Sequence, residues 1–123
     1  MVILRKAVLD AFAESLRSDY LDRMANRIRT VFPDYYYRAT VEQVRAFIAD
    51  SIAKAAEFGL DEESTVGRFM DYRLLYGMEL ERVPERVWFL RTLADSGVSQ
   101  SERIYEIDMA VFGYSLEPES HAG

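Results

Sequence analysis

Apolar residues recur every three or four positions along most of the chain, which is the spacing of one face of an α-helix. The opening segment shows this spacing with Leu4, Val8, Phe12 and Leu16, each four residues from the next. The following segment continues it with Leu21, Met24, Ile28, Val31 and Phe32. No segment has the convincing alternation of apolar and polar residues that is typical of a half-buried strand, so the chain is predicted to be all-α.

Helix start and stop signals divide this pattern into about six segments. Thr40-Val41-Glu42-Gln43 and Ser99-Gln100-Ser101-Glu102 both match the capping box, in which side chains bond the free N–H groups of a first helical turn. Four glycines each follow a run of apolar residues at helical spacing and are predicted to end helices. They are Gly59, Gly77, Gly97 and Gly113. The predicted helical segments are residues 2–16, 18–32, 40–59, 61–77, 84–97 and 99–113.

Two details of this division stay open or irregular. The first two segments can be one bent helix or a pair joined near Arg17. Tyr35-Tyr36-Tyr37 stands between Pro33 and the first capping box, and is predicted to be a loop.

Because 123 residues suit one domain, we expect a single compact array or bundle of about six helices over residues 1–116. Residues 117–123 are polar and are expected to form a flexible C-terminal tail.

The residue types needed for nucleophilic or metal chemistry are scarce. The chain has no cysteine, and its one histidine, His121, falls in the predicted tail. A catalytic or metal-binding imidazole needs neighbours that hold its ring in place, which a frayed terminus does not supply. The glycines are dispersed and form no phosphate-binding loop. We therefore expect no metal, no cofactor and no enzymatic activity.

Carboxylates leave one enzymatic alternative. The run Asp61-Glu62-Glu63 is explained by a helix start, where acids are favoured by the helix dipole. Glu79 and Glu81 lie in a segment near Arg82 that is expected to be a solvated loop. A hydrolase with paired carboxylates needs two acids about 5–10 Å apart in a cleft, and nothing singles out such a pair. A small hydrolase or toxin that uses Glu79 and Glu81 is the less favoured alternative.

The charge and hydropathy of the chain exclude several partner classes. The net charge of −6 disfavours nucleic acid, since binding to the phosphate backbone depends on Lys and Arg. No stretch approaches the roughly 20 apolar residues of a membrane span. The first residues do not have the order of a signal peptide, because Arg5 and Lys6 follow the apolar Met1–Leu4 instead of preceding an apolar run. We expect a cytoplasmic protein that binds neither nucleic acid nor membrane.

The chain is rich in tyrosine, with eight residues, and this excess is more informative about function than the charged residues are. Tyr and Arg dominate the energetic centres of protein interfaces. The partner-binding candidates are Tyr35, Tyr36, Tyr37, Arg38, Tyr72, Arg73, Tyr76 and Trp88. Tyr72 and Tyr76 share a helix face with Arg73 beside them. Apart from Trp88, the candidates form two groups, residues 35–38 and residues 72–76. The alternative for each group is that its rings cover a small core, and the alternative for Trp88 is a buried position.

The order of these features resembles a group of small helical proteins encoded in bacterial type VI secretion and effector gene clusters. The resemblance spans about residues 5–112 and departs from the family pattern at Tyr35–Tyr37. It is carried by Arg29-x-x-Phe32-Pro33, Ala55-Ala56-Glu57-Phe58-Gly59-Leu60, Phe69-Met70-Asp71-Tyr72 and Leu75-Tyr76-Gly77-Met78-Glu79. It implies no catalytic residues, and an accessory role as an adaptor, chaperone or immunity-type protein that binds a secreted effector or spike component.

These observations together predict a non-enzymatic, cytoplasmic protein-binding module of a bacterial secretion or toxin system. A self-associating structural homodimer, formed through the alanine-rich or aromatic face, is the alternative.

Overall fold

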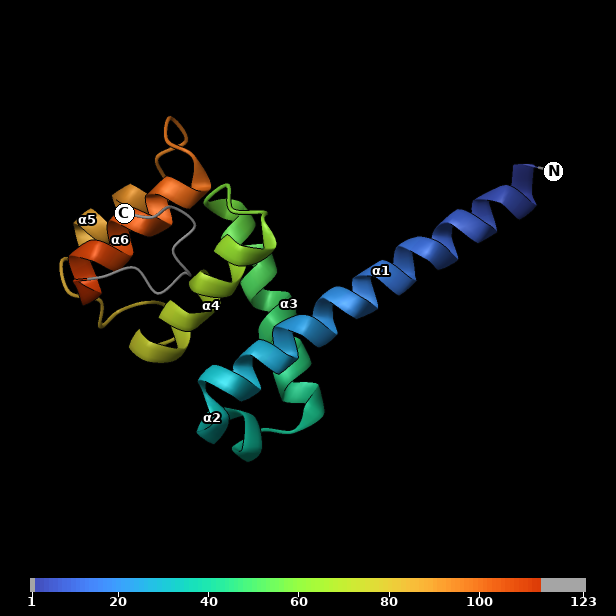
Figure 1. Cartoon of the computed structure of the whole chain (residues 1–123), viewed down its shortest axis with the longest axis horizontal. Helices are drawn as coiled ribbons and strands as arrows, with labels where there is room; N and C mark the ends of the chain where they lie inside the picture. Colours follow the sequence, from blue (N-terminus) through green and yellow to red (C-terminus); the bar gives the residue numbers. More distant parts are fainter. Residues whose placement is uncertain (1, 114–123) are drawn as a thin grey trace, which may run out of the picture. The chain divides into compact units, whose positions relative to one another are not determined.

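The structure is a computed structural model that describes the backbone of residues 2–113 and the side chains of residues 17–113 (Figure 1). Within these residues it contains six helices and no strand, which confirms the all-α prediction. The helices are α1 (Val2–Val31), α2 (Pro33–Arg38), α3 (Val41–Glu57), α4 (Glu63–Tyr76), α5 (Arg86–Leu93) and α6 (Gln100–Phe112). The predicted tail, residues 117–123 with His121, lies outside the described residues. In the described part of the chain, no helix has the length and apolar character required to cross a membrane.

The six helices are not the six that the sequence predicted. The first two segments form one continuous helix, α1, of 30 residues. The prediction of a loop at Tyr35–Tyr37 is wrong, because these residues belong to the short helix α2. Pro33 occupies a first-turn position of α2, where its missing N–H costs no hydrogen bond, and Asp34 favours the same turn through the helix dipole.

The predicted helix ends are mostly confirmed. Thr40 Oγ1 accepts from the Gln43 backbone N–H at 3.0 Å, and Gln43 Oε1 accepts from the Thr40 N–H at 2.8 Å, so the first capping box is reciprocal. Gly59 follows α3 with φ of +76°, and its N–H donates to Ala56 O at 2.9 Å. Gly97 does not end a helix, because α5 already ends at Leu93.

The start of the fifth helix is also corrected. The predicted segment begins at Pro84, but α5 begins at Arg86. Glu85 between them has a left-handed φ of 54°, which is outside the right-handed helical region, so a regular helix begins only after it.

Backbone contacts gather into two units, Met1–Asp50 and Ser51–Gly123, and the boundary falls within α3. Among the described side chains of the first unit, residues 17–50, the buried hydrophobic ones are Met24, Ile28, Val44, Phe47 and Ile48. The core of the second unit is larger and includes Leu60, Phe69, Met70, Phe89, Leu93 and Ile107. The single domain over residues 1–116 stays a prediction.

Candidate functional site

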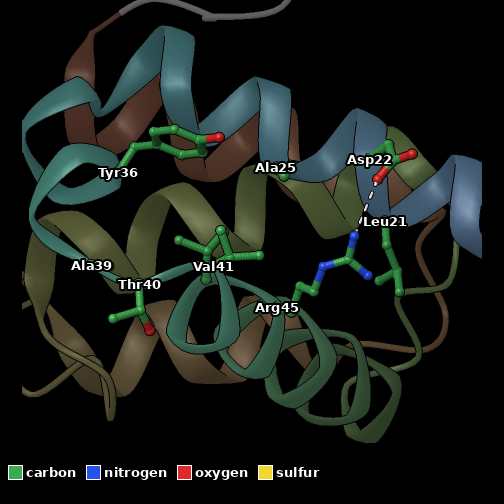
Figure 2. A pocket seen from close by; sticks show the side chains of 9 residues that line it. Leu21, Asp22, Ala25, Tyr36, Ala39, Thr40, Val41 and Arg45 are labelled. Atoms are coloured by element: carbon green, nitrogen blue, oxygen red, sulfur yellow. Dashed lines mark ion pairs between the residues drawn. The ribbon is translucent and has the colours of Figure 1, made fainter.

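The first unit contains a hollow of about 180 Å³ between α1, α2 and the start of α3 (Figure 2). We call it the α1–α3 hollow. It is lined by Leu21, Asp22, Ala25, Tyr36, Ala39, Thr40, Val41, Val44 and Arg45. Most of these side chains are apolar, and they come from three successive elements of the chain. The hollow therefore depends on how α2 is placed between α1 and α3.

Local sequence signals place α2. Phe32 precedes Pro33, which disfavours helical geometry at Phe32 and ends α1. Seven residues after Pro33, the capping box at Thr40 starts a new helix. Leu21 and Ala25 on α1 are four residues apart and therefore share a face of that helix.

The three consecutive tyrosines of α2 have different environments. Successive residues of a helix are about 100° apart around its axis, so neighbours face different directions. The ring of Tyr35 packs against Phe47 of α3, with ring centroids 5.6 Å apart. Tyr36 lines the α1–α3 hollow, and its ring meets the ring of Tyr37 edge to face at 5.1 Å. Tyr37 itself is 72% exposed.

A polar pair stands at the edge of the hollow. Arg45 Nη2 lies 3.7 Å from Asp22 Oδ1, and the two side chains are 55% and 65% exposed (Figure 2). An exposed ion pair of this kind contributes only about 0–1 kcal/mol, so either partner is available to another polar group at little cost.

A second hollow of about 510 Å³ adjoins the first at Ala39. It is lined by Tyr35, Arg38, Ala39 and Gln43. Arg38 is exposed at the end of α2. Of the predicted group Tyr35–Arg38, Tyr36 thus lines the first hollow and Tyr35 and Arg38 line the second, whereas Tyr37 lines neither.

The size of the α1–α3 hollow indicates what it can hold. An apolar cavity of about 150 Å³ binds a molecule the size of benzene. The 180 Å³ of the α1–α3 hollow therefore have room for one leucine or phenylalanine side chain.

The second predicted group is corrected by the structure. Tyr72 is 0% and Arg73 3% exposed, so neither lies on a surface that a partner could contact. The Tyr72 hydroxyl donates to Asp108 Oδ1 of α6 at 2.6 Å. Arg73 Nη1 donates to Ser51 Oγ at 2.6 Å, and its Nε donates to the backbone oxygen of Met78 at 3.1 Å. Both side chains are interior because their polar atoms find partners inside the second unit.

Tyr72 belongs to a buried cluster of charged residues. Arg68 forms ion pairs with Asp71 and with Asp108 Oδ1, the second at 3.0 Å. Burial of the ring, followed by its hydrogen bond to Asp108, holds the pKa of Tyr72 far above its ordinary value. Burial alone would lower the pKa of Arg68, but the hydrogen bond and charge of Asp108 outweigh it and raise that pKa. The cluster joins α4 to α6 and is closed to solvent.

The remaining candidates lie at partly exposed positions of the second unit. Tyr76 is half-buried at the end of α4, and burial raises its pKa. Trp88 is half-buried on α5, whereas its neighbour Phe89 is fully buried and meets the Tyr72 ring at 5.3 Å. A partner-binding role for Tyr76 and Trp88 stays a prediction.

The carboxylates of the enzymatic alternative lie in solvated surroundings. The Glu79 side chain is 72% exposed and lies 3.8 Å from Lys54 Nζ. Glu81 packs its carboxylate against Gly77, where an added Cβ would come within 2.5 Å of Oε1. Among the described residues, no group of three or more His, Asp or Glu side chains has the arrangement of a metal site.

Several lining residues were not predicted as site residues. Spacing alone places Leu21 in an apolar helical stripe and Val41 in a capping box, whereas both residues line the hollow. One available signal was the position of Val41, an apolar residue in a first helical turn beside a tyrosine cluster.

Comparison of the chain with protein-family models, with curated proteins and with solved structures finds no match.

Proposed function

We propose that the chain is a non-enzymatic protein-binding module whose α1–α3 hollow receives one apolar side chain of a protein partner. The observation that carries this proposal is the hollow itself, which is mostly apolar and has the volume of a single large side chain. Small-molecule sites usually have about 300–1,000 Å³, so a side chain suits this volume better than a separate ligand.

The surroundings of the hollow support a protein partner. Protein interfaces combine an apolar centre with a polar rim. Val41 and Tyr37 are 65% and 72% exposed, which adds apolar surface in α2 and α3. The Arg45–Asp22 pair supplies polar groups at the edge.

The cellular role belongs to the same proposal. The resemblance to proteins of type VI secretion and effector clusters suggests an adaptor, chaperone or immunity-type protein. Its partner would be a secreted effector or spike component that it meets in the cytoplasm.

The test compares two matched valines. Val41→Asp places a charge at the edge of the hollow, whereas Val87→Asp does the same on α5 of the second unit. Val41 and Val87 are 65% and 72% exposed, and both lie in a first helical turn, where an added carboxylate favours the helix dipole. Neither change should lower the melting temperature.

The measurement is affinity purification from the native host, followed by titration with the purified partner. We expect the wild-type chain and Val87→Asp to bind the same partner, and Val41→Asp to bind it at least tenfold more weakly. Ala25→Leu, which fills the hollow, should weaken binding in the same way. Equal binding by the wild type, Val41→Asp and Ala25→Leu would refute the role of the hollow.

A further inference from the structure

The charged side chains that line the two hollows of the first unit are unevenly partnered. They are Asp22 and Arg45 at the α1–α3 hollow and Arg38 at the second hollow. Asp22 and Arg45 form an ion pair with each other at 3.7 Å, whereas the Arg38 side chain has no hydrogen bond or ion pair within residues 17–113. The acids four residues before and after Arg38, Asp34 and Glu42, line neither hollow. The linings therefore present one more cation than acid, and that cation is Arg38.

Gln43 adds further donors to the second hollow. Its Oε1 accepts from the Thr40 N–H at 2.8 Å, so the oxygen of the side-chain amide belongs to the capping box. The amide nitrogen Nε2 has two N–H groups, and it donates to no residue in the described part of the chain. Because the capping box already orders this side chain, its donors need little further ordering to bind a ligand.

These donors suit a carboxylate. The planar guanidinium of an arginine donates two parallel hydrogen bonds to one carboxylate group. A phosphate group carries nearly twice the charge and is usually bound by a cluster of arginines. The second hollow contains one arginine and one amide, together with Tyr35, which matches a single negative charge better than a phosphate.

We propose that the second hollow binds the carboxylate of an Asp or Glu of the partner, close in sequence to the apolar residue whose side chain enters the α1–α3 hollow. The inference rests on the proposed function, because both residues belong to the same partner segment. The two hollows share Ala39 in their linings, so they adjoin. A span of about four residues reaches up to about 14 Å, which allows one short segment to occupy both.

The first experiment uses a phage-displayed library of short random peptides, selected on the full chain. We expect the enriched peptides to share a leucine or phenylalanine with an Asp or Glu within about four residues of it. Ala25→Leu, which fills the α1–α3 hollow, should abolish this enrichment. An enriched apolar residue without a neighbouring acid overturns this inference and leaves the proposed function standing. Enrichment that Ala25→Leu leaves unchanged, or no enrichment at all, overturns both.

The second experiment exchanges the charges. An enriched peptide, and the same peptide with Lys in place of its acid, are titrated against the wild type, Arg38→Glu and Arg91→Glu. Arg91 is the matched control, because both arginines are exposed and lie in the last turn of a short helix, α2 or α5. We expect Arg38→Glu to bind the acidic peptide about tenfold more weakly than the wild type does, and the lysine peptide more tightly. Arg91→Glu should bind both peptides as the wild type does.

The outcomes separate the site from other causes. Tighter binding of the lysine peptide by Arg38→Glu cannot come from a loss of folding. Equal weakening by Arg38→Glu and Arg91→Glu would show an effect of net charge alone and overturns the carboxylate site. A peptide with phosphoserine in place of the acid should bind no more tightly than the acidic peptide. Binding about tenfold tighter than that would indicate a phosphate site and overturns the proposal.

Discussion

At the scale of single residues, the buried hydroxyl of Tyr72 has the most distinctive environment. It donates to a carboxylate oxygen of Asp108 at 2.6 Å, and its ring meets Phe89 at 5.3 Å. A hydrogen bond to a charged group contributes about 1.5–3 kcal/mol. We expect Tyr72→Phe to keep the ring contact and to lower the free energy of unfolding at pH 7 by about that amount, measured by urea titration. Tyr37→Phe, at a 72% exposed position, is the control and should have no measurable effect.

The same hydroxyl predicts a loss of stability at alkaline pH. Tyrosine in an unfolded chain ionises near pH 10, whereas the pKa of folded Tyr72 is raised well above that value by burial. The folded state therefore binds more protons above pH 10, so the stabilisation is complete below pH 10 and is lost as the pH rises further. Tyr72→Phe lacks this proton, and its difference from the wild type should shrink as the pH rises from about 10 to 11. A difference that stays constant over this interval would contradict the assignment.

Spacing alone could not distinguish the two tyrosine groups. Tyr72, Arg73 and Tyr76 share one side of a helix, and a sequence pattern does not say whether that side is covered. The hydrogen-bond acceptors that make burial of Tyr72 and Arg73 favourable are Asp108 and Ser51, which are 36 and 22 residues away. Pairing over such separations leaves no local signal, so the sequence could not decide between a partner-binding surface and a position over the core.

At the scale of elements, helix ends set by nearby residues were predictable. The first capping box is a contact over three residues, and both of its hydrogen bonds are present. The Ser99 cap of α6 is also present, since its hydroxyl accepts from Glu102 N at 3.2 Å. Tyr35–Tyr37 was mispredicted because a six-residue helix is too short for apolar periodicity, leaving only Pro33 as a signal.

The start of α4 depends on a residue of another helix, and this gives a prediction. Gln100 Oε1 accepts from the N–H groups of Asp61 and Glu62 at 2.9 and 3.1 Å and from Thr65 Oγ1 at 2.7 Å. One side chain thus replaces the local cap that α4 lacks. Gln100→Ala should lower the free energy of unfolding by about 1 kcal/mol, because the exposed N–H groups of Asp61 and Glu62 lose this acceptor, whereas Thr65 Oγ1 still donates to Glu62 O at 3.0 Å.

The Gln100 prediction is checked by urea unfolding against Ser101→Ala, which alters the neighbouring exposed residue of the same helix. The control should differ from the wild type by less than about 0.5 kcal/mol. An equal effect of both substitutions would mean that the bonds to Gln100 do not hold the start of α4.

At the scale of the whole molecule, the acidic charge belongs to one unit. The first 50 residues contain eight Lys and Arg and seven Asp and Glu, a net charge of +1. Residues 51–123 contain seven and fourteen, a net charge of −7, so the two units together give the −6 of the chain. Three arginines of the second unit are buried against only two acids, Asp71 and Asp108, which leaves its surface slightly richer in acid. Overall composition predicted the acidity but not this division, which depends on which segments contact one another.

This imbalance predicts that moderate salt stabilises the second unit. Like charges on its surface repel in the folded state, and about 0.15 M salt screens charges more than about 8 Å apart. The buried pairs of Arg68 are screened much less, and the exposed Lys54–Glu79 pair at 3.8 Å contributes little. We expect the melting temperature to rise by a few degrees between about 0.01 and 0.15 M NaCl. Glu106→Gln, which removes one exposed acid from α6, should raise it at low salt and make it less dependent on salt. A melting temperature that falls as salt is added would mean that attractive surface pairs outweigh the repulsion.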